Sequence, residues 1–120
     1  MRVLVVDDSR AMRMIVRRSL RQAGFEHLDV IEAENGLEAL DIAKRESPGL
    51  ILSDWNMPQM SGLEMLVALR EAGKAMPVGF LTAQSSPEMR ERAFAAGAAF
   101  LVAKPFTADD VKAAISPFVH

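Results

Sequence analysis

The sequence predicts an α/β fold in which helices cover both faces of a parallel sheet. Short apolar runs alternate five times with longer stretches of helical period. No linker, low-complexity tract or second hydrophobic pattern interrupts this alternation. Because repeated strand–helix units form parallel sheets that are covered on both sides, we expect one doubly wound domain over residues 1–120.

The composition is that of an ordinary globular domain. Half of the 120 residues are hydrophobic, a quarter are charged, and the net charge is −2, which gives no reason to expect nucleic-acid binding. The absence of cysteine excludes a disulfide framework and a thiolate metal site, and it suits a reducing compartment. There is no signal-peptide layout and no apolar run of membrane-spanning length. We therefore expect a cytoplasmic protein that does not insert into membranes.

Five apolar runs mark the expected strands. They are VLVV at 3–6, VI at 30–31, LIL at 50–52, VGFL at 78–81 and FLVA at 100–103. The second run is the least apolar, since Asp29 and Glu32 flank it, and this suits an edge of the sheet. The phase of the pattern does not fix the order of the strands.

Capping residues and apolar spacing predict the first two helices. The first is expected after Ser9 and stops at Gly24. Its apolar face consists of Met12, Ile15, Val16, Leu20 and Ala23. The second follows Asn35 and Gly36, a pair that also forms hairpin turns, but the sequence LEALDIAKRE after it favours a helix.

The remaining three helices carry similar boundary residues. The third begins with a capping box from Ser61 to Glu64. The fourth has Pro87 in its first turn and stops at Gly97. The fifth starts at Thr107, with acidic residues in its favourable first turn.

The ends of four expected strands carry chemically capable side chains. Asp7 and Asp8 end the first, Asp54 the third, Thr82 the fourth and Lys104 the fifth. Open α/β sheets bind their ligands beyond the carboxyl ends of the strands, so these side chains are expected to converge. Three crowded carboxylates need a cation, and an oxygen-only set favours Mg²⁺ over zinc.

A metal alone does not account for Thr82 and Lys104. An ammonium group and a hydroxyl group beside a magnesium site match the needs of an incoming phosphoryl group. A carboxylate could then act as the nucleophile and form an aspartyl phosphate. Asp54 is the better candidate, because Asp7 and Asp8 form a flanking metal-binding pair.

Simpler interpretations exist for single residues. Asp8 or Ser9 could cap the first helix, Thr82 could be a turn residue, and Lys104 could be solvated. A basic stripe on the first helix is interpreted as a solvated face, with docking of an acidic phosphodonor domain as the alternative. This stripe consists of Arg10, Arg13, Arg17 and Arg21.

Five short motifs together carry a family resemblance. VVDDS, SDWNMP, MSGLE, LTA and KPF follow in the order and spacing typical of receiver domains of two-component response regulators. The chain resembles this family over essentially its whole length, and within it the single-domain chemotaxis regulators most. The resemblance implies a flavodoxin-like fold with strand order 2-1-3-4-5 and five helices.

The resemblance also implies a function. The domain would be a phosphorylation-activated switch that takes a phosphoryl group from a histidine kinase or a phosphotransfer domain. It would bind a downstream protein through the fourth helix, the fifth strand and the fifth helix. It would not be an enzyme in the ordinary sense, although slow self-phosphorylation from small donors and self-dephosphorylation are expected.

Residue roles follow from the same resemblance. Asp54 would be the phosphoacceptor and would share the magnesium ion with Asp8. Asp7 would help largely through water, and Asn56 would add its backbone carbonyl. Lys104 would pair with phosphoryl oxygens.

Two further features complete this assignment. Thr82 would move to hydrogen-bond one phosphoryl oxygen. The bond between Lys104 and Pro105 is expected to be cis, which is accessible because an X–Pro bond prefers trans by only about 0.5–1 kcal/mol.

Two positions depart from the family pattern. Leu101 stands where the family usually has the aromatic ring that turns inward on phosphorylation. Phe100 is one step earlier, and adjacent strand residues face opposite ways, so it is not expected to substitute. Gln84 falls where the family tunes self-dephosphorylation.

Two alternatives remain from other classes. One is a Mg²⁺-dependent phosphohydrolase with an aspartyl-phosphate intermediate, although VVDDS lacks the D-x-D pattern of that class. The other is a receiver cut from a larger response regulator or hybrid kinase, against which the ending ISPFVH, without a linker, favours a stand-alone domain.

Overall fold

The structure, a computed structural model, describes residues 1–83 and 86–119. Its centre is one parallel sheet in the order β2-β1-β3-β4-β5, as the family resemblance implies. The strands are β1 (Arg2–Val6), β2 (Asp29–Ala33), β3 (Leu50–Ser53), β4 (Val78–Thr82) and β5 (Phe100–Ala103). The weakly apolar β2 occupies one edge, as its composition predicts, and β5 occupies the other.

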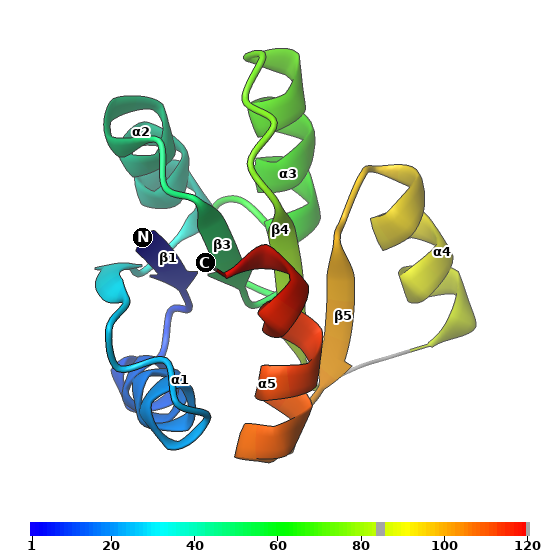
Figure 1. The fold of residues 1–120 in the computed structure, drawn as a ribbon. Coiled ribbons are helices and arrows are strands. Elements are labelled where there is room, and N and C mark those ends of the chain that lie inside the picture. The colour runs from blue at the N-terminus through cyan, green and yellow to red at the C-terminus, as the bar shows by residue number, and fades with distance from the viewer. Residues whose placement is uncertain (84–85, 120) are drawn as a thin grey trace.

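Five α-helices cover the sheet on both faces (Figure 1). They are α1 (Arg10–Gln22), α2 (Gly36–Glu46), α3 (Gly62–Glu71), α4 (Pro87–Ala95) and α5 (Ala108–Ile115). Helices α1 and α5 lie on one face, and α2 and α3 lie on the other with α4 beside β5 (Figure 1). A short 3₁₀ helix, η1 (Ser116–Phe118), follows α5 and was not predicted from the sequence.

Side-chain caps explain where the helices begin. Ser9 accepts a hydrogen bond from the amide of Met12, and Asn35 accepts one from Glu38, so the helical interpretation of the Asn-Gly pair is correct. The predicted capping box at Ser61 is present, and its hydrogen bonds lower the pKa of the Glu64 carboxyl. A second capping box, at Thr107 and Asp110, was missed because aspartate replaces the usual Glu or Gln.

A separate hydrophobic cluster lies on each face of the sheet. The α1/α5 side packs against one set of strand residues, and the α2/α3/α4 side packs against the alternate set. One predicted core residue is wrong, because Ile15 is 44% exposed. The buried stripe of α1 runs through Val16, Leu20 and Ala23, and Ile15 lies about 100° around the helix from Val16, beyond the margin of that stripe.

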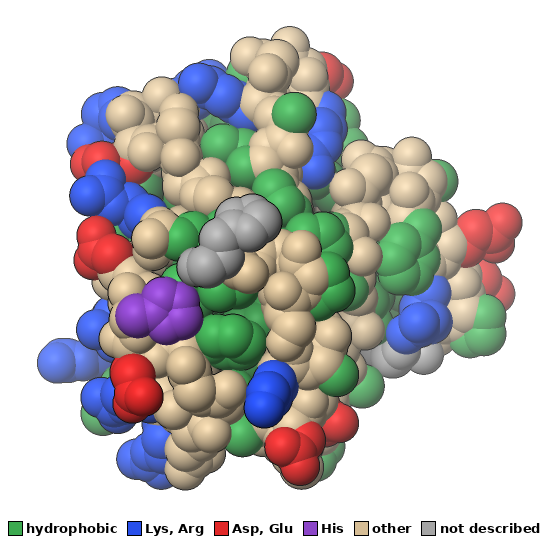
Figure 2. Space-filling model, viewed as in Figure 1, with side chains coloured by type: hydrophobic (Ala, Val, Ile, Leu, Met, Phe, Trp, Pro, Cys, Tyr) green, Lys and Arg blue, Asp and Glu red, His purple; other side chains and the backbone are tan. Residues whose placement is uncertain are grey.

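Charged side chains of both signs lie next to one another along the α1–β2–α2 side of the molecule (Figure 2). Arg2 pairs with Asp29 and Glu46, and Arg45 pairs with Asp41 at 3.1 Å. These pairs are well exposed, so each contributes about 0–1 kcal/mol. Among the described helices, none combines the length and apolar character that a membrane crossing requires.

Candidate functional site

Three carboxylates and one ammonium group meet beyond the carboxyl ends of the strands. Asp7 and Asp8 follow β1, and Asp54 follows β3; one oxygen from each lies within 4.8 Å of the others. Lys104, which follows β5, has its Nζ 3.3 Å from Asp7 Oδ2 and 3.5 Å from Asp54 Oδ1. The parallel sheet therefore brings together four of the predicted side chains from three segments.

Asp7 is buried and fixed by contacts on several sides. Its amide donates to the carbonyl of Ala33 at 3.1 Å, and its Oδ1 accepts from the amide of Ser9 at 2.9 Å. Its other carboxylate oxygen faces Lys104. Asp8 is exposed, and the cap of α1 is Ser9, so the interpretation of Asp8 as the helix cap is wrong.

Asp54 is held where β3 leaves the sheet. Its amide donates to the carbonyl of Val6 at 2.9 Å, and its Oδ1 accepts from the amide of Trp55 at 2.8 Å. Burial raises the pKa of the Asp54 carboxyl; the Lys104 ammonium opposes this shift and the neighbouring Asp7 carboxylate adds to it. A cation beside the carboxylate would favour its ionised form.

Gly62 permits α3 to begin directly against Asp54. The Gly62 amide donates to the carbonyl of Trp55 at 2.8 Å. A Cβ at this position would overlap the carbonyl oxygen of Asp54 and would lie 2.7 Å from a ring carbon of Phe80. Sequence reasoning did not identify this role, although the glycine directly after the Ser61 cap was a usable indication.

The other predicted positions lie around this cluster. Thr82, the last residue of β4, is fully buried, and its carbonyl accepts from the Lys104 amide at 2.7 Å. The Lys104–Pro105 bond is cis. Asn56 is exposed in the segment after β3, and Gln84 lies outside the described residues.

Strand β5 points its two candidate switch side chains to opposite faces. Leu101 is buried in the cluster on the α2/α3/α4 side, and it pairs in register with Phe80 of β4. Phe100 packs into the other cluster, with its ring centroid 5.7 Å from that of Phe118. The alternation expected from the sequence is correct, and Phe100 does not place its ring on the face that Leu101 occupies.

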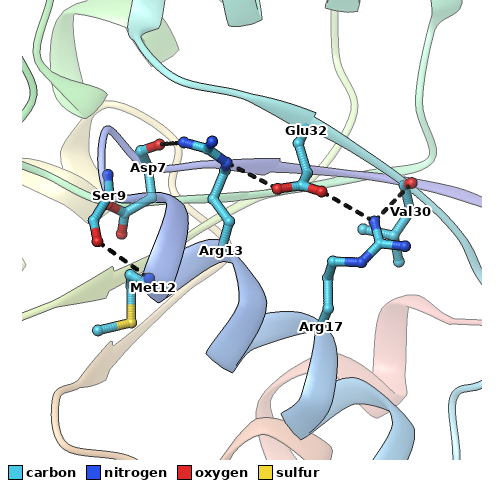
Figure 3. Close-up of polar contacts among 7 residues, drawn as sticks. All are labelled: Asp7, Ser9, Met12, Arg13, Arg17, Val30 and Glu32. Atoms are coloured by element: carbon cyan, nitrogen blue, oxygen red, sulfur yellow. Dashed lines mark hydrogen bonds and ion pairs between the residues drawn. The ribbon is translucent and has the colours of Figure 1, made fainter.

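The basic stripe of α1 is not a uniformly solvated face. The Arg13 side chain is only 13% exposed, and its Nε lies 2.8 Å from Glu32 Oε1. Arg17 approaches the other oxygen of Glu32 at 3.3 Å (Figure 3). The solvated interpretation is therefore wrong for Arg13, which lies between α1 and β2.

The donor set fits a hard divalent cation. Three carboxylates and one ammonium leave the cluster with an excess of negative charge, which a cation would neutralise. Carboxylate oxygen is the ligand that Mg²⁺ takes most readily, usually through one or two protein carboxylates together with water and phosphate. The ammonium of Lys104 stands beside the same carboxylates, where it can pair with an anion that the cation also attracts.

The fold and the site together define a class: an open parallel α/β domain with an acidic cation pocket and a lysine at the carboxyl edge of its sheet. The family can be stated more closely. The response regulator receiver domain family matches residues 3–116, and the chain belongs to this family.

Individual relatives agree with this membership. A chemotaxis protein CheY homolog of Campylobacter jejuni is 40% identical over 115 residues, which cover 93% of this chain and 87% of the relative. The structure of chemotaxis protein CheY4 of Vibrio cholerae has a TM-score of 0.87 at 34% identity and covers 98% of both chains. The receiver domain of the putative regulator NarL of Mycobacterium tuberculosis has a TM-score of 0.88 at 31% identity, covering 97% of this chain and 93% of its own.

Proposed function

We propose that this receiver domain is a phosphorylation-controlled switch in which Asp54 accepts the phosphoryl group in a Mg²⁺-dependent reaction. The observation that carries the proposal is the approach of Lys104 to Asp54, at 3.5 Å, within a cluster of three carboxylates. A lysine and a cation pocket around one half-buried acid supply what an aspartyl phosphate requires. The CheY names of the relatives support a role in chemotaxis or motility.

The transfer balances without a further reagent. A carboxylate oxygen of Asp54 attacks phosphorus, and the bond from phosphorus to the donor breaks, leaving its electron pair on the donor. With a histidine donor, the leaving group is the imidazole nitrogen, and the product is a mixed anhydride of carboxylate and phosphate. Lys104 pairs with phosphoryl oxygens, and Thr82 hydrogen-bonds one of them once it has moved toward the product.

Asp8, Asp54 and the backbone carbonyl of Asn56 would hold magnesium, with Asp7 assisting through water. Bound Mg²⁺ would supply positive charge to the phosphoryl oxygens. The buried Asp7 carboxylate has a second role, because it holds Lys104 in place at 3.3 Å. Loss of Asp8 would therefore remove a magnesium ligand, whereas loss of Asp7 would also release Lys104.

The signal is proposed to leave through α4, β5 and α5. A hollow of about 590 Å³ opens beside β5 and α5, and six of its seven lining residues are apolar. Its lining consists of Leu101, Val102, Ala103, Pro105, Asp110, Ala113 and Ala114. Pro105 directly follows Lys104, so this surface adjoins the phosphorylation site. A downstream protein that reads phosphorylation is the proposed occupant.

The phosphoacceptor is tested with a small acyl phosphate and Mg²⁺. We expect intact-mass analysis to show one added phosphoryl group on the wild-type protein and none on Asp54→Asn. No kinase is needed, because the positioned carboxylate and its neighbouring charges supply the stabilisation. Equal labelling of both proteins would remove Asp54 from the role of acceptor.

The metal site is tested separately by Mg²⁺ titration. Trp55 is the only tryptophan of the chain and directly follows Asp54. Because its backbone amide donates a hydrogen bond to the Asp54 carboxylate, we expect a change at that carboxylate to shift the Trp55 backbone and alter its fluorescence. Asp8→Ala should weaken the affinity strongly, whereas it leaves the hydrogen bonds of Asp7 in place. An unchanged titration would exclude Asp8 as a ligand.

A further inference from the structure

Arg13 of α1 connects the cation pocket to the edge strand β2. Its Nη1 donates to the backbone carbonyl of Asp7 at 2.6 Å, and its Nε pairs with Glu32 at 2.8 Å. Glu32 uses its second oxygen for Arg17, which also donates to the carbonyl of Val30 at 3.2 Å. Figure 3 shows the two arginine side chains on either side of the Glu32 carboxylate.

The position of the accepted carbonyl gives this contact its importance. The carbonyl of Asp7 and the amide of Asp8 belong to one planar peptide group. A donor that fixes the carbonyl therefore fixes the direction in which the chain enters Asp8. Among the described residues, no hydrogen bond or ion pair holds the Asp8 carboxylate itself. Its aim toward the pocket depends on the backbone.

The surroundings of Arg13 keep its guanidinium in one place. Only 13% of its side chain is exposed, and Glu32 both neutralises its charge and orients its fork. Arg17 anchors Glu32 in turn, because it bonds to the backbone of β2 as well as to the carboxylate. The three side chains form a brace from β2 to the Asp7–Asp8 peptide.

We propose that Arg13, held by Glu32, is a positioning residue that aims Asp8 at the divalent cation. The inference rests on the proposed magnesium site. Arg13 contacts the backbone beside a ligand and not the cation itself. Supporting contacts of this kind typically change metal affinity by 10- to 100-fold when they are removed.

The sign of the expected effect separates positioning from simple electrostatics. Arg13 carries a positive charge close to a cation site, so its removal by Coulomb's law alone would strengthen Mg²⁺ binding. Loss of positioning would weaken the binding instead. Arg18 is an exposed residue of the same helix, and Arg18→Ala removes the same charge without breaking the brace.

The experiment compares the Mg²⁺ affinities of the wild type, Arg13→Ala and Arg18→Ala by calorimetry and by Trp55 fluorescence. We expect about tenfold weaker binding in Arg13→Ala and wild-type affinity in Arg18→Ala. Thermal unfolding without Mg²⁺ is measured alongside. If the ion pair of Arg13 with Glu32 is merely structural, its loss should lower the melting temperature and leave the Mg²⁺ affinity unchanged. Equal affinities in the two variants, or tighter binding in Arg13→Ala, would overturn the proposal.

Two milder variants decide the question if Arg13→Ala does not fold. Arg13→Lys keeps the charge and loses the fork, and Glu32→Gln keeps an acceptor for Arg13 and loses its countercharge. Both should bind Mg²⁺ less tightly than the wild type, and wild-type affinity in both would overturn the proposal. A wild-type protein that binds no Mg²⁺ overturns the metal site together with the brace. Weakened binding in Asp8→Ala but not in the brace variants overturns the brace alone.

Discussion

The carboxyl ends of β1 and β3 differ from the edge strand β5 in how their key side chains are held. At β1 and β3, Asp7 and Asp54 are fixed by backbone and side-chain contacts. On β5, Leu101 holds the position at which the family resemblance implies an aromatic ring, and Phe100 places its ring on the other face of the sheet. Several contacts hold each of these two acids in the pocket, whereas on β5 the position of the proposed switch holds a leucine and the ring lies on the opposite face.

Two buried glycines, one beside the acceptor Asp54 and one beside β5, differ in what occupies the space of a Cβ. Gly62 faces the backbone of Asp54, directly after β3, where the carbonyl of Asp54 leaves no room for a Cβ. Gly79 of β4 lies under the ring of Phe100, its register partner on β5, and the ring atoms occupy the place of a Cβ. Backbone limits the first position, and a side chain limits the second. Substitutions at the two glycines should therefore differ in whether they can be rescued.

The largest effect is expected for Gly62→Ala. The new methyl group would push the Asp54 backbone and the Phe80 ring, so we expect loss of phosphorylation by an acyl phosphate and a stability loss of about 3 kcal/mol. Intact-mass labelling and urea unfolding measure the two effects. Phe80→Leu in the same chain should not restore labelling, because the Asp54 carbonyl still overlaps the methyl group. Wild-type labelling of Gly62→Ala would show that the backbone of Asp54 can shift without loss of phosphorylation.

Gly79→Ala should be destabilising and yet chemically silent. We expect a loss of about 2 kcal/mol as the Phe100 ring is displaced, with Asp54 still labelled normally. Phe100→Val makes room, so the double variant should recover part of the loss, with a coupling energy of about 1 kcal/mol. Additive losses in urea unfolding, or loss of labelling, would contradict this account of β5.

The sequence was sufficient for features that depend on near neighbours or on the topology of the sheet. Ser61 caps α3 through the residue three positions away, which is a local contact visible as a motif. Asp7, Asp54 and Lys104 converge because parallel strands end at one edge, so strand assignment alone brings them together. The strand order came from the family resemblance.

Contacts that depend on helix rotation and side-chain direction were not predictable in this way. Arg13 and Glu32 are 19 positions apart, and their pairing depends on how α1 is rotated against β2. The stripe of arginines looked like a solvated face because periodicity reports spacing and not the neighbour. The cover that Phe100 provides for Gly79 likewise requires both the strand register and the ring direction.

A third prediction concerns the coupling from the pocket to β5. Thr82→Ala should remove most of the difference in amide exchange of α4 and β5 between the unmodified protein and the protein with a bound phosphoryl mimic. Leu101→Met conserves volume, costs less than about 1.5 kcal/mol, and should retain most of that difference, because Leu101 has no ring to move. A ligand shifts an equilibrium only through its differential contacts. Loss of the difference in Leu101→Met alone would place the switch on β5.

The smallest expected effect is the pH dependence of stability that Asp54 causes in the absence of Mg²⁺. Burial first, with Asp7 adding to it, raises the pKa of Asp54 above 3.8, so the folded protein holds this proton more tightly than the unfolded chain. The free energy of unfolding therefore falls as pH rises from the ordinary value through the raised one. Asp54→Asn has no such proton, so its melting temperature should exceed that of the wild type at neutral pH, and the advantage should disappear below about pH 4.

A measurement with Mg²⁺ adds to this last test, because the ionised Asp54 carboxylate, which destabilises the fold when Mg²⁺ is left out, is the form that binds the cation. Saturating Mg²⁺ should raise the melting temperature of the wild type at neutral pH, by the free energy of binding to the folded state. Asp54→Asn lacks one of the three carboxylates and should gain less, so the gap between the two proteins should narrow or reverse. If the melting temperature of Asp54→Asn exceeds that of the wild type by the same amount with and without Mg²⁺, the cation does not offset the destabilisation by the ionised Asp54 carboxylate.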